Sequence, residues 1–192
     1  MKGKKVTMTK ISIPELKKQL KTYKPEELVS IIIDCYKSSS DVKSYIHMML
    51  EPESTENQLF DEAEKKISHQ FFPDRGHPKL KLAEAKKAIS EFSKLCNNQA
   101  RTIELMIYYV ELGVSFTSSY GDIDEPFYYS MESMYQNALN KIRTDSGSGL
   151  YHLFRDRLKG IVRNTDGMGW GFHDQLAGMF YEFAADYEDD IE

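Results

Sequence analysis

NQARTIELMIYYVELGVSFTSSYGDIDEPFYYSMESMYQNALNKIR, which covers residues 98–143, decides the fold because it predicts two long helices joined by one tight turn. Residues 99–120 are apolar on almost every side, a pattern typical of a helix buried in a protein core. Their number approaches that of a membrane-spanning helix, but Glu104 and Glu111 lie inside the segment. We therefore expect a central core helix and no membrane span.

The turn of this hairpin carries residues that end one helix and begin the next. Gly121 suits the left-handed conformation that follows a helix, and Asp122 or Asp124 is placed to cap the second helix, with Pro126 in its first turn. One apolar stripe then recurs at helical spacing: Phe127, Met131, Met134, Ala138 and Ile142. We expect the stripe to be buried and the opposite face of this helix to lie in water.

Helical spacing continues through the rest of the chain, and no segment shows the sustained two-residue alternation of a half-buried strand. We predict an all-α fold of about nine helices in antiparallel hairpins, as a bundle or a short helical-repeat-like array, with no significant sheet. The expected helices span residues 13–22, 25–37, about 42–49, 55–70, 82–96, 99–120, 127–142, 150–161 and 172–187. Leu16 and Leu20 should point inward, and the apolar run at residues 28–36 predicts that the second helix is buried.

Length and composition favour a single domain. The chain has 192 residues, of which 41% are hydrophobic and 29% charged, as in ordinary globular proteins. We expect one all-helical domain at residues 11–187, with a possible subdivision into residues 11–70 and 82–187 at the aperiodic loop between them. Residues 1–10 are basic and predict a flexible N-terminus, while residues 188–192 predict an acidic tail.

The compartment is inferred from the N-terminus and the cysteines. No apolar run follows the basic start, so the sequence predicts no signal peptide. The two cysteines, Cys35 and Cys96, lie within helical patterns and lack CxxC spacing, so we expect buried, reduced thiols. Both observations favour a cytoplasmic protein.

Three long motifs stand out: FFPDRGHPKLKLAEAKKAISEF at residues 71–92, YYVELGVSFTSSYGDIDEPFYYSMESMY at residues 108–135, and GMGWGFHDQL at residues 167–176. They resemble an uncharacterised bacterial all-helical family, domain of unknown function 6155. That resemblance spans about residues 11–181 and implies an all-helical fold and a bacterial source, but no activity. The turn at residues 121–125 is also similar to a tetratricopeptide hairpin, although no second copy occurs about 34 residues away.

The acidic turn is a candidate metal site. Asp122, Asp124 and Glu125 offer the oxygen ligands that hard cations prefer. The rest of a calcium loop is missing, however, because neither its sixth-position glycine nor its twelfth-position glutamate is present. We therefore favour capping and turn formation as the role of these acids.

Two further segments carry candidate ligand-binding residues. Trp170, His173 and Asp174 lie where the last helix begins, and a histidine there suits a base or a ligand. We favour the alternative that Trp170 and Phe172 fill the core while His173 and Asp174 occupy the first turn of the helix. The alternating glycines at 167, 169 and 171 have no obvious capping purpose. Arg75, His77 and Lys79 precede the fifth helix and suit an anion, but no glycine-rich phosphate motif accompanies them, and we favour a solvated, loop-stiffening role.

The function hypotheses belong to three classes. We favour a non-catalytic helical module that binds a protein or peptide, with Tyr128, Tyr129 and Tyr135 as candidate recognition groups. The alternatives are a metal- or anion-binding enzyme that uses the acidic turn together with His173, and a nucleic-acid-binding protein that uses its lysine-rich N-terminus. The common catalytic motifs HExxH, GxSxG and the Walker loop are absent, and the sequence indicates no cofactor.

Overall fold

The computed structural model describes residues 11–145, 147 and 149–188. These residues contain nine α-helices and no strand, so the all-α prediction is confirmed. The basic segment at residues 1–10 lies outside the described residues, as does the acidic tail beyond residue 188. The chain divides into two compact units between Leu50 and Glu51, and not at the loop of residues 71–79.

The N-terminal unit contains three helices: α1 (Ile13–Leu20), α2 (Pro25–Ser38) and α3 (Ser40–Leu50). None of them has a buried residue, so the prediction that α2 is buried is wrong. Leu16 is exposed and Leu20 only half-buried. The physical reason is that an apolar run is buried only where enough neighbouring chain covers it, and three short helices supply too little.

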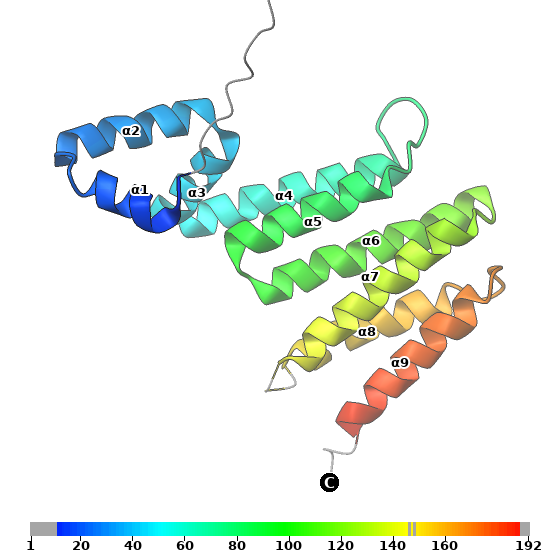
Figure 1. Cartoon of the computed structure of the whole chain (residues 1–192). Helices are drawn as coiled ribbons and strands as arrows, with labels where there is room; N and C mark the ends of the chain where they lie inside the picture. Colours follow the sequence, from blue (N-terminus) through cyan, green and yellow to red (C-terminus); the bar gives the residue numbers. More distant parts are fainter. Residues whose placement is uncertain (1–10, 146, 148, 189–192) are drawn as a thin grey trace, which may run out of the picture. The chain divides into compact units, whose positions relative to one another are not determined.

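The C-terminal unit contains six helices: α4 (Pro52–Phe71), α5 (Leu82–Cys96), α6 (Gln99–Tyr120), α7 (Glu125–Arg143), α8 (Gly149–Arg163) and α9 (Phe172–Glu188). Successive helices pair as antiparallel hairpins, α4 with α5, α6 with α7, and α8 with α9 (Figure 1). Helix α6 contacts α4, α5, α7 and α8. It is therefore the central helix of this unit, as its apolar sequence predicts.

The α6–α7 hairpin forms as the sequence predicts. The Asn98 side chain caps α6 by accepting a hydrogen bond from the backbone N–H of Arg101 at 3.1 Å. Gly121 follows α6 with a φ of 87°, a value that glycine adopts without strain. Asp124, rather than Asp122, caps α7, because its Oδ1 accepts a hydrogen bond from the backbone N–H of Phe127 at 3.0 Å.

The buried face of α7 is broader than the expected stripe. All five stripe residues are buried, but so are Tyr128, Tyr135 and Leu139. The cause is that α7 packs against α6, α8 and α9, which cover more than one side of it. The prediction of one buried apolar stripe with the opposite face in water therefore underestimates how much of α7 is buried.

The charged residues inside α6 are paired. Glu111 forms a two-pronged ion pair with Arg157 of α8, with N–O distances of 2.9 and 2.7 Å. Glu104, two turns earlier, lies 3.5 Å from the same guanidinium. Its partners raise the pKa of Arg157, mainly through the hydrogen bond to Glu111. The two acids therefore join α6 to α8 at the edge of the core.

Candidate functional site

The acidic turn and the glycine-rich segment come together in the structure. The Asp122 Oδ1 atom accepts hydrogen bonds from the Tyr128 hydroxyl at 2.6 Å and from the backbone N–H of Gly169 at 3.2 Å. Asp122 precedes α7 and Gly169 precedes α9, so one carboxylate joins two hairpins of the C-terminal unit. We call Asp122, Tyr128 and Gly169 the carboxylate clamp.

The clamp changes the acidity of both side chains in it. The Tyr128 hydroxyl, followed by the Gly169 N–H, holds the pKa of Asp122 below its ordinary value, because both donors favour the ionised carboxylate. The pKa of Tyr128 is raised, first by burial and then by its hydrogen bond to Asp122. Both groups thus keep their usual neutral-pH charge states, with Asp122 ionised and Tyr128 protonated.

The alternating glycines have a structural explanation in this arrangement. Gly167 and Gly171 have φ values of 76° and 66°, which favour glycine. Gly169 is needed for close approach, because a Cβ atom there would lie 2.5 Å from the Asp122 Oδ2 atom. The motif at residues 167–176 therefore turns the chain and brings its backbone against Asp122.

The aromatic residues of this motif divide between core and solvent. Phe172 is fully buried, and its ring centroid lies 4.9 Å from that of Tyr128. Trp170 is 60% exposed, so the alternative that it fills the core is wrong. Its φ of 61° turns the chain between two glycines, and only Phe172 of the two aromatic residues fills the core as expected. Trp170 thus remains accessible to a ligand.

His173 and Asp174 do not join the clamp. The His173 Nδ1 atom lies 3.1 Å from the Thr165 hydroxyl, which fixes the ring against the end of α8. Asp174 lies exposed in the first turn of α9, where an acid suits the helix dipole. In the described part of the chain, no hydrogen bond or ion pair connects either residue to Asp122 or Asp124.

The described residues also offer no assembled metal site. No three of their histidine, cysteine, aspartate or glutamate side chains are arranged to hold a metal ion, and that set includes Asp122, Asp124 and Glu125. Asp122 serves the clamp and Asp124 the helix cap. The two aspartates of the turn therefore have structural partners that explain their presence.

Two of the three candidate recognition tyrosines are buried. Tyr128 is only 1% exposed and Tyr135 is fully buried, with its hydroxyl donating to the Leu158 carbonyl at 3.1 Å. Tyr129, in contrast, is exposed. A recognition role for Tyr128 and Tyr135 is excluded in this structure, because α9 and α8 cover the sides of α7 that carry them.

Arg75, His77 and Lys79 lie exposed in the loop between α4 and α5. They are near the start of α5 in sequence, but Lys81 occupies the N-cap position without a side-chain cap hydrogen bond. None of the three lines the groove between α4 and α5. As candidate anion ligands they remain a prediction from the sequence.

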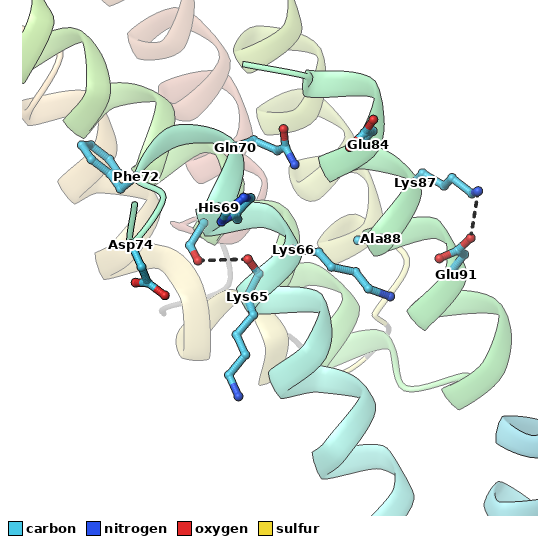
Figure 2. Close-up of a pocket in the computed structure, with 11 residues that line it drawn as sticks. Lys65, Lys66, His69, Gln70, Phe72, Asp74, Glu84, Lys87, Ala88 and Glu91 are labelled. Carbon is cyan, nitrogen blue, oxygen red and sulfur yellow. Dashed lines mark hydrogen bonds and ion pairs between the residues drawn. The ribbon is translucent and has the colours of Figure 1, made fainter. Parts of the chain in front are cut away.

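A groove of about 840 Å³ lies between α4 and α5, and sequence reasoning missed it. Figure 2 shows residues of both helices and of the loop around it. Its lining comprises Lys65, Lys66, Ser68, His69, Gln70, Phe72, Asp74, Glu84, Lys87, Ala88 and Glu91. One signal could have found it: Gln70 follows Ala63 and Ile67 at helical spacing, which places a polar residue on the apolar stripe of α4.

The cysteines differ from the expectation in part. Both are free, but Cys35 is exposed and Cys96 is half-buried. Burial raises the pKa of the Cys96 thiol to about 11, so this group stays protonated at neutral pH. Cys35 lies on α2, whose side chains are not covered by the N-terminal unit itself.

Fold and site together define a class: an all-helical protein of antiparallel hairpins, with a structural carboxylate clamp and an open groove. The chain belongs to a family of unknown function (DUF6155), whose model matches residues 11–184. No curated protein and no solved structure gives a significant match. Among the described residues, no helix combines the length and the apolar character needed to cross a membrane.

Proposed function

We propose that this protein is a non-catalytic protein-interaction module that binds through the apolar surface of α2. The single observation that carries the proposal is the exposure of aliphatic side chains that share one face of this helix. Val29, Ile32 and Ile33 lie three and four positions apart and are 54%, 51% and 45% exposed. Such a contiguous apolar surface is typical of a site that another protein covers.

The contact between α2 and α3 leaves this surface open. The two helices are joined by Tyr36, whose hydroxyl lies 2.8 Å from the His47 Nε2 atom and whose ring stacks on the imidazole. The Lys43 ammonium lies 5.7 Å from the centre of the same tyrosine ring. The aliphatic residues of α2 are thus not needed to hold α3 and remain available for a partner.

The charges of α2 favour a second copy of the same chain as the partner. Glu26 and Glu27 lie in the first turn of the helix and Lys37 in its last turn, with the aliphatic residues between them. If two copies of α2 pack antiparallel about Ile32, Glu26 of each copy faces Lys37 of the other. A two-fold interface is self-complementary in this way. We therefore propose a homodimer formed through α2.

Sedimentation equilibrium and light scattering of the full chain test the proposal. We expect wild type to dimerise and Ile32→Glu to be monomeric, because the substitution places two like charges at the centre of an apolar contact. Leu153→Glu is the matched control, because Leu153 is a similarly exposed leucine in the C-terminal unit. A wild-type monomer at high micromolar concentration would overturn the homodimer, and so would a dimer that Ile32→Glu leaves intact.

Charge reversal tests the antiparallel pairing separately. Glu26→Lys should weaken the dimer, and adding Lys37→Glu in the same chain should restore it, because the acid and the base then exchange places. Restoration should disappear at high salt, since exposed charges are screened. A double variant as weak as Glu26→Lys alone would speak against this orientation.

The proposed location is the cytoplasm. The support is that both cysteines are free and that the exposed Cys35 lies on the proposed interface helix. Reduced thiols persist in a reducing compartment.

A further inference from the structure

The groove between α4 and α5 combines a buried polar floor with charged walls. Ala88 and Gln70 are buried and lie at its base, whereas Lys65, Lys66, His69 and Lys87 are exposed along its sides. Figure 2 shows the side chain of Gln70 directed from α4 toward the start of α5. A volume of about 840 Å³ lies within the range of small-molecule sites in proteins.

Gln70 has a buried acceptor without a partner. The residue is 6% exposed, and no described residue donates a hydrogen bond to its Oε1 atom. Buried amide oxygens in proteins are otherwise almost always hydrogen-bonded. Gln70 continues the helical spacing of Ala63 and Ile67, a position at which an apolar residue would be expected. A ligand that supplies a hydrogen-bond donor would account for the amide at this position.

The backbone holds Gln70 in place at the end of the groove. Its carbonyl accepts a hydrogen bond from the Leu80 N–H at 3.1 Å, which fastens the loop of residues 72–81 back onto α4. Leu80 itself has a φ of 48°, a conformation that leucine rarely adopts. The position of the amide is thus fixed by contacts that do not use its side chain.

Ion pairs between described residues offset the charges on the α5 wall of the groove but not those on the α4 wall. Glu84 pairs with Lys81 at 2.9 Å and Glu91 with Lys87 at 3.5 Å, so these charges of α5 are largely offset. Lys65 and Lys66 form no ion pair with a described residue, and His69 lies one turn further along the same helix. The α4 wall therefore attracts an anion. Asp74, on the loop, adds an acid at another part of the lining.

We propose that this groove binds a hydroxyl-bearing phosphate monoester, such as a sugar phosphate or a nucleoside monophosphate. The phosphate lies against Lys65, Lys66 and His69, since two ammonium groups and an imidazole suit a dianion. The Oε1 atom of Gln70 has almost no exposed area in the ligand-free protein, so the amide turns toward the groove when a hydroxyl of the ligand donates to it. The site is separate from the α2 surface and does not depend on the homodimer.

Calorimetric titration of the full chain with ribose 5-phosphate and with adenosine 5′-monophosphate tests the site. Ribose and inorganic phosphate serve as the two halves of the ligand and should each bind more weakly than the ester. We expect Lys66→Met to weaken ester binding by about tenfold or more, as the loss of a charge-assisted hydrogen bond does. Lys159→Met, a lysine on the exposed surface of α8, is the matched control and should bind as wild type does.

Gln70→Met separates binding from stability. The methionine has a similar size and no acceptor, so we expect ester affinity to fall about three- to tenfold while the ligand-free protein melts at the wild-type temperature or above. A purely structural glutamine would instead show unchanged affinity. The proposal is overturned if neither ester binds at millimolar concentration, or if both bind Lys66→Met and Gln70→Met as tightly as wild type.

Discussion

Gly169 donates its backbone N–H to the Asp122 carboxylate at 3.2 Å, across 47 residues of sequence. The contact is close enough that a Cβ atom on residue 169 would lie 2.5 Å from the other carboxylate oxygen. Gly169 is therefore present for proximity, whereas Gly167 and Gly171 on either side are present for their positive φ.

Gly169→Ala should destabilise the protein by about 1 kcal/mol or more, because the added methyl group forces the carboxylate away from its donors. Urea unfolding followed by circular dichroism measures the change. In an Asp122→Ala background the same substitution should cost less, because the atoms it would meet are gone. Equal costs in both backgrounds would show that the methyl group is accommodated elsewhere.

The sequence predicts contacts between residues that are close along the chain better than contacts between distant segments. The cap of α7 is a contact over three residues, between Asp124 and Phe127, and the residue types limit it to Asp122 or Asp124. The Asp122–Gly169 contact joins distant segments and has no local signature. The three alternating glycines were noticed in the sequence, but only the folded chain explains them.

Burial is the second property that the sequence predicts incompletely. The apolar run of α6 lies in the core and that of α2 does not, although both helices contain a long apolar run. The difference is the number of neighbouring helices, which is a tertiary property. Gln70 is the opposite case, because this polar residue at the end of α4 is buried, and its helical spacing with Ile67 is the only sign of burial in the sequence.

Acid should reveal the lowered pKa of Asp122. A carboxylate whose folded pKa lies below its unfolded value of about 3.9 stabilises the fold above that pH, and the contribution is lost as the pH falls through the folded pKa. Asp122→Asn should therefore be less stable than wild type at pH 6, and the difference should shrink below about pH 4. Urea midpoints measured from pH 6 to pH 2.5 check this expectation.

Glu132 provides a control because its pKa is shifted in the opposite direction from that of Asp122. Burial raises its pKa, so its ionised form disfavours the folded state, and this penalty disappears as the pH falls through the raised value. Glu132→Gln should thus be at least as stable as wild type at pH 7 and lose that advantage in acid. If the stability of the two variants relative to wild type changes with pH in the same direction, the opposite pKa shifts assigned to Asp122 and Glu132 are contradicted.

Two glycines in helices should respond to alanine in opposite directions. In α9, Gly178 has open space around it, so Gly178→Ala should stabilise the protein by about 0.5–1 kcal/mol through the higher helix propensity of alanine. In α6, a Cβ atom on Gly113 would overlap the buried side chain of Met131. Gly113→Ala should therefore destabilise by about 1–3 kcal/mol. Thermal unfolding of both variants tests the expected stabilisation at residue 178 and the expected destabilisation at residue 113.

Met131 decides the interpretation of the Gly113 result. If its steric overlap causes the loss, Gly113→Ala/Met131→Ala should be less destabilised than the sum of the two single variants, because the smaller side chain leaves room for the methyl group. Additive losses would instead place the cause in the backbone of α6.

The ion pair between Arg157 and Glu111 should contribute more than an ordinary surface pair. Its two-pronged geometry fixes both side chains, and each is about two-thirds buried. A double-mutant cycle with Arg157→Met and Glu111→Gln should give a coupling free energy of about 1 kcal/mol. The exposed pair Lys87–Glu91, 3.5 Å apart within α5, should give only about 0.3–0.5 kcal/mol in the matching cycle. Added salt should reduce the second coupling more than the first, because solvent screens exposed charges more effectively. Equal couplings that respond equally to salt would mean that the Arg157–Glu111 pair contributes no more than an ordinary surface ion pair.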